Sequence, residues 1–264
     1  ADAEDDGVGF VRRLRPMHLD AVASQVFFQM DQQAGQLAEV VLTNLLTQRA
    51  QGFQLFRVGE LCDALVDHGM EYVWTGHRDQ KHGGYIWSLD DDGPKDDTKQ
   101  AYGHAFVLLA ASSAKCVGHP LADTVLADVT EVLERRFWEA TPGVTSEEYA
   151  ADWSKISDYR GQNSNMHLTE ALMAAFEATG ESEYLRKAES IAGFIIGKHA
   201  ASLGYRVAEH FDTQWNLFND YRGSEIFRPA GSTPGHWLEW ARLLLQLHEL
   251  GGRKLAWLPE AAAK

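Results

Sequence analysis

Three histidines stand at the beginning of segments that share a local form. These segments are Tyr102-Gly103-His104, Asn165-Met166-His167 and Pro234-Gly235-His236, and their histidines are 63 and 69 residues apart. An imidazole both accepts and donates a proton near neutral pH. Histidines that recur at this interval therefore indicate acid–base chemistry, if the segments that carry them lie side by side around one pocket.

Two of these segments continue as His-x-x-Glu, because Glu170 follows His167 and Glu239 follows His236. On a helix, residues three apart share a face. Either each glutamate only orients its own histidine, or both pairs point at one cavity, and two pairs at a repeat interval favour the cavity. A di-metal centre in a helical bundle uses the order Glu-x-x-His and further carboxylates. We find none at matching positions and predict no metal.

The segment that contains His236 is the more informative of the two. Proline suits the first turn of a helix, and Gly235 lets another group approach the backbone closely. The positive end of a helix favours an uncharged imidazole, which is the form that a general base requires. In the preceding loop, Arg228 adds a cation that could hold a substrate oxygen or form a surface salt bridge.

Two polar runs accompany the histidines. The run from Arg160 to His167 is rich in amide side chains, which suit the hydroxyls of a sugar, although Asn163 or Asn165 could equally cap a helix. The run from Glu209 to Asn216 mixes carboxylates and amides with two large aromatic residues. This composition is typical of a stacking surface for pyranoses, and a packed loop between helices is the alternative.

The elements that must position these residues are helices. Apolar side chains recur at helical spacing in six stripes separated by Gly- and Pro-containing punctuation. The stripes cover Leu61 to Val73, Tyr102 to Ser113, Leu121 to Phe137, Ala171 to Phe176, Tyr184 to Ile196 and Trp237 to Leu247. The interval between the histidines fits one helical hairpin, and hairpins of this kind must stack or close into a barrel to bury their inner faces. We therefore predict an all-α fold.

Residues 1 to 56 fit the repeat less well. Leu37 to Leu46 suggest a helix there, but no hairpin motif appears. The predicted organisation is an atypical N-terminal helical segment, residues 1–56, and a partial barrel domain, residues 57–264. In all, about eight helices are expected.

Composition excludes several classes of function. The chain has 264 residues and a net charge of −14, which repels nucleic acid and anionic membranes. It has no apolar run near ~20 residues and no phosphate-binding loop. Ser88 to Gly93 resemble the start of a calcium loop, but Ser88 stands at the first ligand position and Lys99 stands where the loop needs a glutamate. Two cysteines and no secretory signal indicate a cytoplasmic protein.

Several motifs together resemble the N-acylglucosamine 2-epimerase superfamily, and most of all its aldose–ketose isomerase branch, the mannose and sulfoquinovose isomerases. The resemblance runs from about Leu65 to Lys264, in order and with matching intervals. It rests on His82-Gly83-Gly84-Tyr85, Lys99 to His104, Arg160 to His167, Glu209-His210-Phe211-Asp212 and Pro234-Gly235-His236-Trp237-Leu238-Glu239-Trp240.

The resemblance implies an (α/α)6 barrel of twelve helices with the site in a funnel at one end, a monosaccharide substrate, and no metal or other cofactor. It implies that His236 is an acid/base, and we assign His167 as its catalytic partner. The residues that match further positions of the sugar site are Tyr102, Asn163, Arg228 and Glu239.

The implied reaction opens a sugar ring, removes the proton on C2 and reprotonates the resulting cis-enediol on C1, which converts an aldose into its 2-ketose. A 2-epimerase would return the proton to C2 instead. The chain could also be a non-catalytic carbohydrate-binding remnant or an α/α-barrel glycoside hydrolase. The hydrolase would need two placed carboxylates, for which Glu170 and Glu239 are the obvious pair.

Two departures from the family pattern are visible. The family's Trp-x-x-x-Arg-Met-x-His motif has no counterpart in residues 1 to 60, and its later acid/base histidine is absent, since Trp257 to Lys264 read as the opening of a helix. We therefore expect an incomplete barrel, with about eight of the twelve helices. An exposed inner face would favour self-association into a homo-oligomer.

Overall fold

The computed structural model describes residues 55–223, 228 and 230–264. Contacts divide the chain into a unit of residues 1–62 and a unit of residues 63–264, and the fold below is that of the second unit. The helix predicted at Leu37 to Leu46, and the segment 1–56 apart from its last two residues, lie outside the described residues. Among the described helices, none has the length and apolar character to cross a membrane.

Helices dominate the described part of the chain, and all six predicted stripes fall in helices. The α-helices are α3 (Leu55–Tyr72), α4 (Ala101–Cys116), α5 (Ala122–Val132), α6 (Gln162–Thr179), α7 (Ser182–Ala192), α8 (Pro234–Leu250) and α9 (Trp257–Ala262). Three of them continue as π-helical turns, namely η3 (Val73–His77), η4 (Leu133–Phe137) and η5 (Gly193–Ala200).

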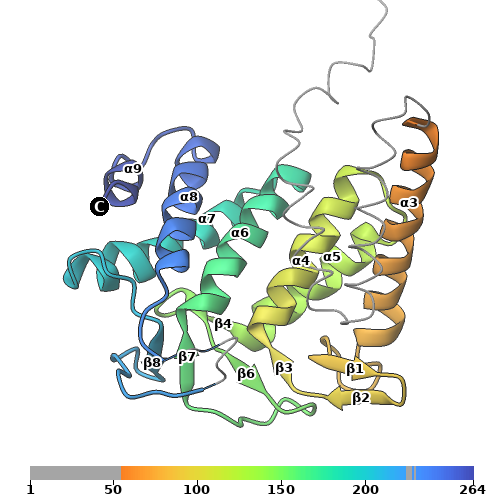
Figure 1. Ribbon diagram of the computed structural model, residues 1–264, viewed down its shortest axis with the longest axis horizontal. Coiled ribbons are helices and arrows are strands. Elements are labelled where there is room, and N and C mark those ends of the chain that lie inside the picture. The colour runs from red at the N-terminus through yellow and green to blue at the C-terminus, as the bar shows by residue number, and fades with distance from the viewer. Residues whose placement is uncertain (1–54, 224–227, 229) are drawn as a thin grey trace, which may run out of the picture. The chain divides into compact units, whose positions relative to one another are not determined.

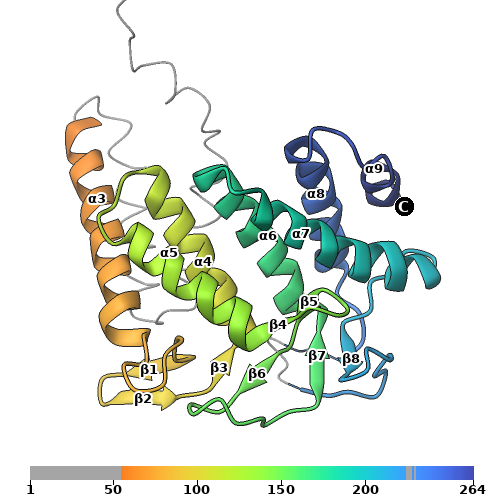
Figure 2. The ribbon, with the colours of Figure 1, turned by 180° about the vertical axis from the view of Figure 1, so that it is seen from behind.

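The helices form the expected hairpins. Helices α4, α6 and α8 rise side by side from one edge of the unit in Figure 1, and seen from behind in Figure 2, α5 and α7 cover them. Helix α4 packs against α6, and α4 buries small and apolar side chains such as Ala105, Leu108 and Ala111. α6 ends where Gly180 adopts φ 75°, the left-handed conformation that closes many helices.

Short strands line the edge from which α4, α6 and α8 begin (Figure 1), and the helical periodicity does not predict them. They are β1 (Ser88–Asp90), β2 (Gly93–Asp96), β3 (Lys99–Gln100), β4 (Trp138–Glu139), β5 (Val144–Thr145), β6 (Glu148–Tyr149), β7 (Tyr159–Gly161) and β8 (His210–Asp212). Strands of two to four residues are too short for an alternating pattern to show. Strand β3, which pairs with β6, leads directly into α4, and strand β7, which pairs with β8, leads directly into α6.

The segment that resembles part of a calcium loop forms an antiparallel hairpin of β1 and β2. Asp90 pairs with Gly93 at its turn, and Gly93 adopts φ 121°. Glycine at a positive φ is a common device in tight hairpin turns. A hairpin therefore accounts for this acidic segment without a bound ion.

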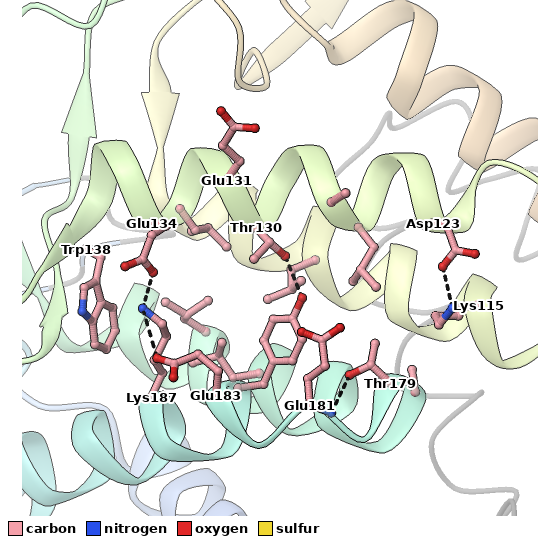
Figure 3. A pocket seen from close by; sticks show the side chains of 18 residues that line it. Lys115, Asp123, Thr130, Glu131, Glu134, Trp138, Thr179, Glu181, Glu183 and Lys187 are labelled. Carbon is pink, nitrogen blue, oxygen red and sulfur yellow. Dashed lines mark hydrogen bonds and ion pairs between the residues drawn. The ribbon is translucent and has the colours of Figure 1, made fainter.

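A groove of about 830 Å³ separates the two outer helices α5 and α7 (Figure 3). Side chains bridge it: Lys187 of α7 pairs with Glu134 of η4, and the hydroxyls of Thr130 and Tyr184 lie 3.0 Å apart. Lys187 also lies 4.1 Å from the ring of Trp138. The groove is lined by none of the predicted site residues, and we interpret it as the seam between neighbouring hairpins.

Candidate functional site

His236 occupies the first turn of α8, as predicted, with Pro234 beginning the helix and Thr233 capping it. Its Nδ1 lies 2.9 and 3.1 Å from the two carboxylate oxygens of Glu209. The Glu209 side chain is only 2% exposed, whereas that of His236 is 18% exposed. A buried carboxylate therefore holds one nitrogen of a histidine whose ring still reaches the surface.

The strand pair β7–β8 explains how Glu209 reaches α6. Gly161 pairs with His210, and the backbone N–H of Gln162 then donates to the carbonyl of Glu209 at 3.1 Å. Gln162 is the first residue of α6, so the ladder fixes the beginning of that helix beside Glu209. The Gln162 side chain donates through Nε2 to Glu209 Oε2 at 2.8 Å.

His167 lies farther along α6, in a group of charged side chains contributed by two helices. Its Nδ1 is 3.6 Å from Glu170 Oε2 and 4.0 Å from Glu239 Oε1. These separations are longer than hydrogen bonds, and His167 Nδ1 and Glu170 Oε2 are buried without a hydrogen-bond partner among the described residues. The polar atoms thus converge without pairing fully, which is an arrangement that a bound polar ligand could complete.

Arg242 joins the two glutamates of this group. Its Nη2 lies 2.6 Å from Glu170 Oε1 and 3.5 Å from Glu239 Oε1. Burial alone would raise the pKa of Glu170, but nearby His167 and the charge of Arg242 outweigh it, so the pKa of Glu170 is lowered. The carboxylate is therefore held in its ionised form.

The same three side chains have the composition of a metal site. Ligand atoms of His167, Glu170 and Glu239 all lie within 4.8 Å of one another. However, the Arg242 guanidinium already contacts both carboxylates, so a cation could bind only by displacing it. The geometry favours a site closed by an arginine over a metal centre.

Aromatic rings of α4 close one side of His167. The rings of Tyr102 and Phe106 lie 5.1 and 4.9 Å from the His167 ring, the first of them edge to face. Tyr102 therefore lies beside His167, and its predicted role in sugar binding stays a prediction. Asn163 lies one turn before His167 on α6 and shares its face.

Arg228 is engaged within the protein. Its two Nη atoms lie 3.1 and 2.6 Å from the carboxylate oxygens of Glu148, and its guanidinium lies 4.5 Å from the Tyr159 ring. A further contact of 3.5 Å joins it to the buried Glu147. This arrangement is an internal ion pair, so the predicted role of Arg228 in substrate binding stays a prediction.

The third repeated segment differs from the other two, because its histidine is part of the core. His104 is fully buried, its Nδ1 lies 2.7 Å from the carbonyl of Gln100, and the backbone N–H of Tyr85 donates to its Nε2 at 3.0 Å. Burial lowers the pKa of His104 to about 4. Both nitrogens are occupied, so the recurrence identifies equivalent helices but not three equivalent functions.

Two residues of the site are missing from the sequence-based assignment, Glu209 and Gln162. Both stand in the polar runs that the sequence singles out, and Glu209 opens one of the motifs that carry the family resemblance. Their role depends on the β7–β8 register, which joins positions 47 residues apart. No local spacing in the sequence could reveal that contact.

Comparisons with known proteins agree with this architecture. A family model described as N-acylglucosamine 2-epimerase (GlcNAc 2-epimerase) matches residues 50–264. A D-mannose isomerase of Pseudomonas cannabina pv. alisalensis is 45% identical over 189 residues, which are 70% of this chain and 45% of that protein.

Solved structures give the same result. A crystal structure of D-mannose isomerase superimposes with a TM-score of 0.69 at 40% identity, covering 75% of this chain and 51% of that one. The cellobiose 2-epimerase from Spirochaeta thermophila DSM 6192 has a TM-score of 0.63 at 20% identity, covering 75% and 50%, and it shares the fold. The helical hairpins are thus those of an (α/α)6 barrel. The chain spans about half the length of the relatives it matches.

Proposed function

Since the chain belongs to the N-acylglucosamine 2-epimerase family, we propose that it is a sugar isomerase that interconverts a mannose-like aldose and its 2-ketose. The observation that carries this proposal is the placement of His236 and His167 on adjacent helices. Glu239, one turn after His236 on α8, lies 4.0 Å from His167. The similarity to D-mannose isomerases supports the choice of an aldose–ketose reaction.

In the proposed reaction, histidines carry the proton. His236 Nδ1 faces the carboxylate of Glu209, so the other ring nitrogen, Nε2, is the atom that can remove the proton from C2 of the opened sugar. The carbonyl oxygen O1 becomes a hydroxyl, which gives a cis-enediol. A proton then returns to C1 while O2 loses its own, so the ketose has the same atoms and no oxidant or reductant is consumed.

We assign His167 as the second acid/base of this reaction. It lies between Tyr102 of α4 and Glu239 of α8, and its Nδ1 is close to two carboxylates. An imidazole in this position could exchange a proton with a sugar oxygen. In this proposal Tyr102, Asn163 and Glu239 bind the sugar, and Arg228 holds Glu147 and Glu148 through ion pairs.

We also propose that the protein is cytoplasmic. Cys62 and Cys116 are exposed free thiols, which suits the reducing cytoplasm.

Helix α8 exposes Leu238 and Leu245 on one face, with exposed fractions of 76% and 49%. We propose that this face supports self-association, which light scattering over a range of concentrations would measure. A mass equal to one chain at every concentration would contradict this.

The experiment incubates the full chain with D-mannose and identifies the products. Fructose that is formed by the wild type and not by His236→Asn supports the isomerase. Glucose in place of fructose would instead identify a 2-epimerase. Binding of mannose in a calorimeter without either product would identify a carbohydrate-binding protein, and release of reducing ends from an oligomannoside would identify a hydrolase. Each of the last three results contradicts the proposal.

A further inference from the structure

A line of hydrogen bonds runs from the core to His236 through Trp240, Gln162 and Glu209. We infer that Glu209, held by Gln162 and Trp240, is the positioning residue that fixes His236 in the tautomer with hydrogen on Nδ1. This inference rests on the proposed function, because it concerns how His236 becomes a base. It adds roles for side chains that the sequence-based assignment does not include.

The carboxylate of Glu209 contacts the imidazole of His236 directly. Both oxygens of Glu209 lie within 3.1 Å of His236 Nδ1. An ionised carboxylate only accepts hydrogen bonds, so a lone pair on Nδ1 would face two lone-pair-bearing oxygens. The hydrogen must therefore be on Nδ1, and in the neutral ring Nε2 carries the lone pair.

The orientation of the Gln162 side-chain amide is set by Trp240. The indole N–H of Trp240 is only a donor, and it lies 2.7 Å from Gln162 Oε1. The amide oxygen therefore faces Trp240, and the amide NH2 faces Glu209. Trp240 is 1% exposed, so it is fixed by the core. The buried indole thus determines which end of the Gln162 amide reaches the site.

Three donors converge on the carboxylate of Glu209. Its carboxylate accepts from Gln162 Nε2 at 2.8 Å, from His236 Nδ1 at 2.9 Å and from the backbone N–H of Thr233 at 3.2 Å. Gln162 Nε2 also lies 2.9 Å from His236 Nδ1, and this contact would become a hydrogen bond only if Nδ1 lost its hydrogen. With three donors converging on it, the Glu209 carboxylate is the acceptor that orients His236.

The contact with Thr233 links this line to the loop before α8. Thr233 caps α8, and the backbone N–H of His236 lies 2.9 Å from its carbonyl. Glu209 therefore holds both the ring of His236 and the backbone that begins its helix. Two attachments of this kind restrict the direction in which Nε2 points.

The inference is tested by nitrogen NMR of histidine-labelled protein, which distinguishes a protonated from an unprotonated ring nitrogen. The spectra are taken at a pH where the imidazole is neutral, and the His236→Asn spectrum assigns the resonance. The wild type should show hydrogen on Nδ1 and none on Nε2. Hydrogen on Nε2 in the wild type would overturn the inference, whatever the activity of the protein.

Variants at Glu209 provide the second measurement. In Glu209→Gln an amide can donate to Nδ1, so hydrogen should move to Nε2, whereas Glu209→Asp should keep the wild-type tautomer. Glu134→Gln, which changes an ion pair between the outer helices, is the matched control and should leave the resonance unchanged. A wild-type tautomer in a folded Glu209→Gln protein would overturn the inference.

Activity separates this inference from the proposed function. In serine proteases, replacing the carboxylate that sets the tautomer of the catalytic histidine lowers kcat about 10⁴-fold. We expect Glu209→Gln to lower kcat by about 10² to 10⁴ with little change in KM, and Glu209→Asp to restore much of it. If the wild type has the expected tautomer but no isomerase activity, the proposed function fails while the positioning role stands. If Glu209→Gln shifts the tautomer but retains full kcat, the positioning role is wrong.

Discussion

Glu239 Oε1 lies 4.0 Å from His167 Nδ1, although Glu239 belongs to the helix that carries His236. Because Glu239 is one turn after His236 on α8, this contact places both histidines along the seam between α6 and α8. The acid–base interpretation depends on both histidines lying at this contact between α6 and α8.

If His236 and His167 act on the same enediol, their effects on rate should not be independent. We expect His236→Asn and His167→Asn each to lower kcat for fructose formation by about 10² to 10⁴. The double variant should be little worse than the more impaired single variant, as for residues that act as a unit. His68→Asn, on an exposed residue of α3, is the control. Fully multiplicative losses would show that the two histidines act separately.

Gly83 and Gly84 provide a matched pair for stability. Both adopt positive φ, 74° and 73°, but a Cβ at Gly83 meets nothing within 4 Å, whereas one at Gly84 lies 2.6 Å from the Trp153 ring and 3.0 Å from His104 Nε2. Gly83→Ala should therefore lower the free energy of unfolding by about 1 kcal/mol, from backbone strain alone. Gly84→Ala should cost about 2 to 4 kcal/mol, since overpacking is added. Equal losses in urea denaturation would contradict this assignment.

His104 should make the protein less stable in mild acid. Its folded pKa of about 4 lies below the ordinary value of 6.5, so the unfolded chain binds a proton between these values and the folded chain does not. Stability is complete above pH 6.5 and falls as the pH drops toward 4, by about 3 kcal/mol at most.

His104→Asn isolates this contribution, because an amide can donate to the Gln100 carbonyl and accept from Tyr85 without titrating. Urea denaturation of the wild type and the variant at pH values on either side of this window measures the difference. The wild type should lose more stability than the variant on acidification. Parallel losses would show that His104 is not the group responsible.

Arg228 should act on stability before it acts on sugar binding. Burial raises the pKa of Glu147, and the charge of Arg228 opposes that rise. Removing the guanidinium leaves Glu147 and Glu148 without their cation, so Arg228→Met should lower the free energy of unfolding by about 3 kcal/mol. Adding Glu148→Gln should restore part of the loss. Unchanged stability together with lost mannose binding would instead support a direct contact with substrate.

The sequence predicts the helices well because each of them shows its buried face as a stripe of apolar residues. The stripe from Leu121 to Phe137 even extends through the π-helical turn that buries Phe137. The short strands escape prediction because two or three residues carry no periodicity. The strand pair β7–β8 matters most, since it brings Glu209 to α6.

In the candidate site too, contacts within one helix can be predicted from the sequence and contacts between distant segments cannot. His236, His167 and Glu239 could be chosen because their spacing on single helices is local. The pairing of His236 with Glu209, and the burial of His104, depend on contacts between segments far apart in the chain. His104 begins its helix as the other histidines do, but Val107 stands where they have a glutamate, and its packing beneath Tyr85 places it in the core.

The most direct test of the account incubates the full chain with D-mannose in D2O and follows the products by NMR. Proton transfer through a cis-enediol at His236 predicts fructose that carries solvent deuterium at C1, and with His236→Asn both should form at least about 10²-fold more slowly. Fructose and C1 deuterium that form equally fast with His236→Asn would contradict the claim that His236 moves the proton between adjacent carbons of the sugar.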